Sequence, residues 1–70
     1  MSNVELPVGI QGELSDMMQE PERLAAHDPV ELRENLIAQY AGIDRERDRQ
    51  YRIVIDERLA EINAAREVDR

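Results

Sequence analysis

The residue best suited to chemistry is His27, the only histidine in this chain of 70 residues. It stands beside Asp28 and four residues before Glu31, so a histidine–carboxylate pair is available for proton transfer. Such a pair also needs a nucleophile, and without Cys or Thr the chain offers only the hydroxyls of Ser2, Ser15, Tyr40 and Tyr51. Ser2 is near the chain end, and both Tyr fall on apolar helix stripes. We therefore interpret His27 as a residue at a helix C-terminus, where the helix dipole favours it.

Metal and phosphate sites are not expected either. One histidine with scattered carboxylates falls short of the three or four ligands of a zinc site. The segment 44–48 has acids at alternate positions but lacks the glycine and the terminal Glu of a calcium loop. Gly9 and Gly12 are too few for a phosphate-binding loop. We expect no cofactor, no small-molecule substrate and no enzymatic activity.

The charge of the chain is negative and unevenly spread. The formal net charge is −7, and residues 1–31 hold seven acids against the single Arg23. Direct nucleic-acid binding is not expected, because the chain lacks a basic surface and has only two aromatic residues for base stacking. All nine basic residues are Arg, whose planar fork suits carboxylate pairing. The charge thus favours a protein partner, or mimicry of nucleic acid.

The length and the apolar pattern predict a small protein that lacks a membrane segment and associates with a second copy or a partner. No basic region precedes an apolar run near the N-terminus, and no apolar stretch approaches 20 residues. We therefore expect a cytoplasmic protein without membrane contact. A single domain of this size buries only about 60% of its unfolded surface, so burial against a second copy or a partner is favoured.

Residues 1–12 predict an extended arm; the alternative is a frayed terminus in which the alternation is chance. Val4, Leu6, Val8 and Ile10 alternate with other residues, which is the period of an extended segment, and Pro7 limits it to an edge position. A short helical region is expected over 13–27, interrupted at Pro21 because proline lacks the helix donor.

A well-marked helix follows, over residues 29–41. Asp28 can cap its N-terminus, Pro29 suits the first helical position, and Glu31 supplies an acid three residues after the cap. Gly42 followed by Asp44 indicates a turn and a new N-cap. The apolar stripe nevertheless keeps its spacing across Gly42, so one continuous helix over 29–67 is the alternative.

The last helix is expected over 44–68. Its opposite charges fall at helical neighbour spacing, as in the pairs Asp44–Arg47, Glu46–Arg49 and Asp48–Arg52. The predicted fold is all-α: an arm over 1–12 and a helical domain over 13–70, whose last two helices form an antiparallel hairpin. We expect it to be oligomeric, because the apolar stripe of the last helix is longer than the preceding helix can cover.

Three functional hypotheses follow. The first is a non-catalytic interaction module that self-associates or docks on a protein partner through its last helix. Its contact residues would be an apolar stripe and four cations that set the register: Tyr51, Ile55, Leu59, Ile62, Arg45, Arg47, Arg49 and Arg52. The second is an acidic inhibitor of a DNA-handling enzyme, of the accessory type found in phages and mobile elements, which would use Glu13, Asp16, Glu20 and Glu22. The third is a small virion or assembly component.

Overall fold

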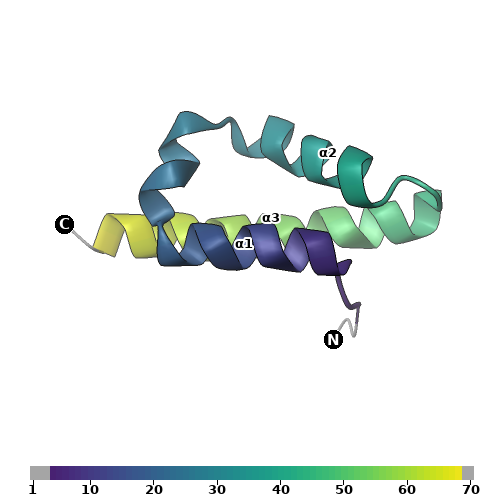
Figure 1. Cartoon of the computed structure of the whole chain (residues 1–70), viewed down its shortest axis with the longest axis horizontal. Helices are drawn as coiled ribbons and strands as arrows, with labels where there is room; N and C mark the ends of the chain where they lie inside the picture. The colour runs from purple at the N-terminus through teal and green to yellow at the C-terminus, as the bar shows by residue number, and fades with distance from the viewer. Residues whose placement is uncertain (1–3, 69–70) are drawn as a thin grey trace.

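The chain folds into an all-α structure, as predicted. A computed structural model describes residues 4–68 and contains no strand in that range. Its elements are α1 (Val8–Gln19), the 3₁₀-helix η1 (Pro21–Ala26), α2 (Pro29–Tyr40) and α3 (Arg45–Val68). The principal extents are 39 × 26 × 18 Å, and α3 runs along most of the longest one (Figure 1).

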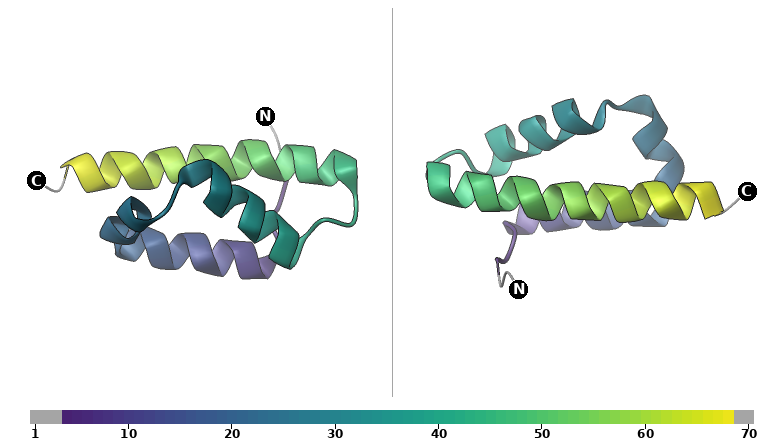
Figure 2. Two further views of the ribbon diagram at one scale, coloured as in Figure 1. Left: turned by 90° about the horizontal axis from the view of Figure 1, so that it is seen from above. Right: turned by 180° about the vertical axis from the view of Figure 1, so that it is seen from behind.

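The helices are arranged around α3. Helices α1 and α3 lie side by side and run in the same direction, and α2 runs back over one side of this pair (Figures 1 and 2). The 3₁₀-helix η1 carries the chain from the end of α1 to the start of α2 and also contacts α3. Each of the other elements therefore contacts α3.

The N-terminal arm is shorter than predicted. Residues 8–12 belong to α1, so the expected extended arm over 1–12 is wrong there, and residues 1–3 lie outside the described range. The physical reason is that Ile10, Leu14 and Met17 share one side of α1, and Leu6, which precedes the helix, is buried with them. Val8, which the alternating pattern placed with them, is 85% exposed.

The start of α1 is also where α2 comes close. A Cβ atom built on Gly9 would overlap the ring of Tyr40, the last residue of α2. The absence of a side chain at Gly9 therefore lets the Tyr40 ring pack directly on the backbone of α1.

The predicted breaks and caps before α2 are confirmed. Helix α1 ends before Pro21, which takes the first position of η1. At the start of α2 the Asp28 carboxylate accepts a hydrogen bond from the Val30 N–H at 3.0 Å, and Pro29 occupies the first helical position.

The chain also breaks at Gly42, so the continuous helix over 29–67 is wrong. Gly42 has φ = +91°, a left-handed conformation that residues with a side chain rarely adopt. After it, Asp44 caps α3 through hydrogen bonds from the N–H groups of Glu46 (2.9 Å) and Arg47 (3.4 Å).

Asp48 fixes this turn from the side of α3. Its carboxylate accepts a hydrogen bond from the Gly42 N–H at 3.1 Å, and the residue is only 8% exposed. The bond joins the first turn of α3 to the turn that follows α2, and so fixes the connection between the two helices.

The core is built on one side of α3. Ile55, Leu59 and Ile62 are buried there, and the other three elements supply the side chains that cover them. These are Leu6 and, from the helices, Ile10, Leu14, Met17, Leu24, Leu36 and Ile37. At roughly 1.5–3 kcal/mol for each buried aliphatic side chain, this cluster provides the main stabilising free energy of the fold.

A surface ion network ties α2 to α3 beside this core. Arg52 donates two hydrogen bonds to the Glu34 carboxylate, at 2.9 and 3.0 Å. Arg33 bonds to the same carboxylate at 2.9 Å and reaches Asp56 at 3.0 and 3.2 Å. Hydrogen bonds from Arg52 and then Arg33 lower the pKa of Glu34 from 4.5 to about 2. The shared carboxylate also raises the pKa of both guanidinium groups.

Replacing Asp48 by Ala should lower the free energy of unfolding by about 1.5 kcal/mol, because the Gly42 N–H then loses its side-chain acceptor in a partly buried hydrogen bond. The matched control is Glu46→Ala, an exposed acid in the same helical turn, which should cost less than about 1 kcal/mol. Urea unfolding followed by circular dichroism compares the variants. Equal losses would show that Asp48 does not brace the turn.

Stability should also fall with acid through Glu34. Because its folded pKa is about 2, against 4.5 without these partners, ionised Glu34 stabilises the fold above about pH 4.5. This contribution is lost as the pH falls from 4.5 towards 2. The side chain is 42% exposed, so we expect less than about 1 kcal/mol. The difference in unfolding free energy between the wild type and Glu34→Gln should shrink between about pH 6 and about pH 3, measured by urea titration. A constant difference contradicts this role.

Candidate interaction surfaces

The apolar stripe predicted to bind a partner lies inside the folded chain. Ile55, Leu59 and Ile62 are buried, and Tyr51 packs against the same cluster while partly buried. Contrary to the prediction, these four residues do not form an exposed docking face. The reason is that α1 and η1 cover the part of α3 that the shorter α2 leaves open.

The four cations predicted to set the register separate into two groups. Arg52 is held by Glu34, as described above. Arg45, Arg47 and Arg49 are exposed and form no ion pair within residues 4–68. The three predicted pairs of the last helix are therefore absent there. The Asp44 and Asp48 carboxylates bond backbone N–H groups instead, and Glu46 pairs with no cation within residues 4–68.

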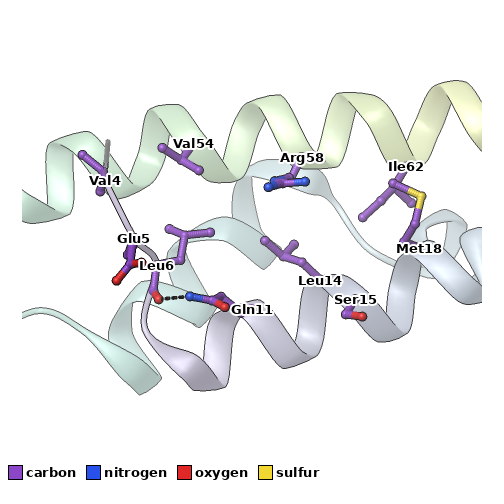
Figure 3. Close-up of a pocket in the computed structure, with 10 residues that line it drawn as sticks. All are labelled: Val4, Glu5, Leu6, Gln11, Leu14, Ser15, Met18, Val54, Arg58 and Ile62. Atoms are coloured by element: carbon purple, nitrogen blue, oxygen red, sulfur yellow. Dashed lines mark hydrogen bonds between the residues drawn. The ribbon is translucent and has the colours of Figure 1, made fainter. Parts of the chain in front are cut away.

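A groove opens between α1 and α3 on the side away from α2; we call it the α1–α3 groove (Figure 3). Its volume is about 510 Å³. One wall comes from α1, the other from α3, and the segment before α1 closes one end (Figure 3). The lining residues are Val4, Glu5, Leu6, Gln11, Leu14, Ser15, Met18, Val54, Arg58 and Ile62.

The lining mixes six apolar residues with four polar ones, one of them the cation Arg58 on the α3 wall. Arg58 lies between Val54 and Ile62 on that wall, and its side chain is exposed (Figure 3). Within residues 4–68 its only ion pair is with Glu61 at 3.6 Å, which is longer than a good hydrogen bond. At the closed end, the Gln11 side chain donates a hydrogen bond to the Leu6 carbonyl and fixes the segment before α1. The groove therefore combines a preformed apolar floor with an accessible guanidinium.

A second hollow of about 490 Å³ lies between η1 and α3, and His27 is on its edge. His27 follows η1 as its C-terminal cap residue, as the sequence suggested, and Asp28 is engaged in capping α2. Asp56 also lines this hollow but is bonded to Arg33. Of the candidate nucleophiles, Ser15 lines the other groove and Tyr40 packs on Gly9, whereas Ser2 lies outside the described residues. The described residues bring no hydroxyl into this hollow beside His27.

The alternative acidic surface is located mainly on α1. Glu13, Asp16 and Glu20 are three and four residues apart, so they share one side of α1 and its C-terminal cap, and Glu22 follows in η1. None of the four forms an ion pair within residues 4–68. Asp16, Glu20 and Glu22 are exposed and Glu13 is partly buried.

The α1–α3 groove was missed by the sequence reasoning. Met18 and Val54 carried a weak signal, because each flanks the main apolar stripe of its helix. These two residues identify a shared groove only once it is known that α1 and α3 lie side by side in the same direction. That arrangement depends on η1 reversing the chain, which no local pattern specified.

Within residues 4–68 no group of three or more His, Asp or Glu side chains is placed to hold a metal ion. None of the helices in this range is both long and apolar enough to cross a membrane.

Comparison of the chain with protein-family models, with curated proteins and with solved structures finds no match. Function must therefore be inferred from the surfaces described above.

Proposed function

We propose that this chain is a non-catalytic interaction module that holds a segment of a protein partner in the α1–α3 groove. The observation that supports this proposal is the groove itself, whose floor of Leu6, Leu14, Val54 and Ile62 is preformed by core residues. A partner that fills it would gain apolar burial without reordering the fold.

The groove wall favours a helical or extended segment over a rigid small molecule. Met18 is partly exposed on the rim, and its flexible thioether can repack around side chains of different shape. Long open grooves between helices commonly take an amphipathic segment, whose apolar side chains point towards the floor.

Arg58 specifies the charge of that segment. The long contact with Glu61 leaves most of its five N–H donors available, and a carboxylate can accept two of them at once. The proposed ligand is thus an amphipathic protein segment that carries an Asp or Glu opposite Arg58.

The groove can be tested by blocking it without touching the core. The tagged full chain is used to capture proteins from its host, and the captured protein is then titrated against purified variants. Ser15→Arg and Met18→Asp should each weaken binding at least tenfold, because Ser15 and Met18 are exposed groove residues. Arg58→Ala should weaken binding to a smaller extent, by several fold, through loss of the carboxylate pair.

Val8→Asp is the matched control, because Val8 is an exposed apolar residue of α1 that does not line the groove. It should leave binding unchanged, and circular dichroism should show the same helix content for every variant. A partner that binds all these variants equally would rule out the groove.

A second candidate function is favoured by the carboxylates of Glu13, Asp16, Glu20 and Glu22. In this proposal the acidic side of α1 and η1 imitates the charge of nucleic acid and occupies the basic cleft of a DNA-handling enzyme. The unpaired state of all four acids within residues 4–68 supports it, since no internal cation neutralises them.

Replacing these four acids together by their amides distinguishes the two proposals. If the acidic side binds, affinity should fall at least tenfold and should become less dependent on salt, because screened charge pairs are removed. The same variant should keep its groove and its helix content. Unchanged affinity and an unchanged salt slope would eliminate the acidic proposal while leaving the groove proposal open to its own test.

A further inference from the structure

The side of α3 that faces away from the core is uncovered along the helix. We call it the outer face of α3; it comprises Glu46, Arg49, Gln50, Ile53, Glu57 and Ala64, which are all exposed. In the view from behind, α3 lies in front of the other helices along its whole length (Figure 2). Ile53, near its middle, is 55% exposed.

Charges are placed symmetrically about Ile53 on this face. Arg49 lies four residues before it and Glu57 four residues after it, which puts all three on one stripe of the helix. Neither Arg49 nor Glu57 forms an ion pair within residues 4–68. They are eight residues apart, or about 12 Å along the helix, so they cannot pair with each other in one chain.

We infer that two copies of this chain associate through the outer face of α3, packed antiparallel about a twofold axis at Ile53. In that arrangement a residue four positions before Ile53 faces the residue four positions after it in the other copy. Arg49 of each copy then meets Glu57 of the partner, and Ile53 meets itself. The contact is self-complementary, as a twofold interface requires.

The charges select the antiparallel orientation. A parallel pair in the same register would place Arg49 against Arg49 and Glu57 against Glu57, which is repulsive. Antiparallel packing forms two opposite-charge pairs around one apolar contact, and the Arg fork suits carboxylate pairing. The contact area is that of one helix pair, so we expect a weak, concentration-dependent dimer. This inference does not depend on a ligand in the α1–α3 groove.

Sedimentation velocity of the full chain, over concentrations up to millimolar at physiological ionic strength, tests the association. The wild type should pass from 8.1 kDa towards twice that mass as concentration rises. Arg49→Glu and Glu57→Arg should each weaken the dimer at least tenfold. The double variant Arg49→Glu/Glu57→Arg should restore it, because both pairs re-form with their signs exchanged.

Net charge alone predicts a different pattern. Arg49→Glu changes the formal charge from −7 to −9, whereas Glu57→Arg changes it to −5, which would favour association if only general repulsion mattered. Arg23→Glu in η1 also gives −9 but lies off this face, so it should leave the dimer unchanged. The groove variants Ser15→Arg and Met18→Asp should likewise keep the dimer, even if the proposed function fails.

A cysteine probe tests the axis directly, because the chain has no Cys of its own. Under mild oxidation Ile53→Cys should form a disulfide-linked dimer many times faster than Val8→Cys, since Ile53 faces its own copy across the axis. A wild type that remains at 8.1 kDa throughout, a double variant that fails to restore association, or equal cross-linking of the two cysteine variants would each overturn the inference.

Discussion

Burial of one apolar stripe of α3 holds the fold together, because every other element reaches that stripe. Ile55, Leu59 and Ile62 are covered jointly by side chains from α1, η1 and α2, so no two of the helices form the core by themselves. In a chain of 70 residues this arrangement matters, since a small domain has little other apolar surface to bury. Loss of the stripe would therefore unfold the whole chain rather than one helix.

The same stripe determines which surfaces remain for binding. Since the core occupies one side of α3, partners can reach only its edges and its opposite side. One edge forms the α1–α3 groove with Met18 and Arg58, and the side opposite the core carries Ile53 with its flanking charges. A partner segment and a second copy of the chain would therefore bind to different residues of the same helix.

Polar contacts refine this arrangement at the junction of α2 and α3. The buried Asp48 carboxylate bonds to the Gly42 N–H, and Glu34 is shared between Arg33 and Arg52. The Asp48 residue is buried, whereas the Arg52 and Glu34 side chains are 40% and 42% exposed. The Asp48 bond holds the turn itself, and the ion network adds little free energy, because ion pairs this exposed are screened by solvent.

The sequence by itself determined the helical class, the break at Pro21 and the cap at Asp28; it favoured a break at Gly42 with a cap at Asp44, but the structure decided between that break and a continuous helix. Each is a local effect: proline lacks a donor, glycine adopts positive φ, and a short carboxylate side chain bonds to nearby N–H groups. Alternation over residues 4–10 misled the prediction of an extended arm, because in so short a segment Leu6 and Ile10 fit either period. The tertiary structure alone decided that the α3 stripe is internal and that Arg52 pairs across to Glu34 rather than along its own helix. Both outcomes depend on where α1 and α2 pack against α3, and that position is set by contacts between residues far apart in the sequence, which no local pattern contains.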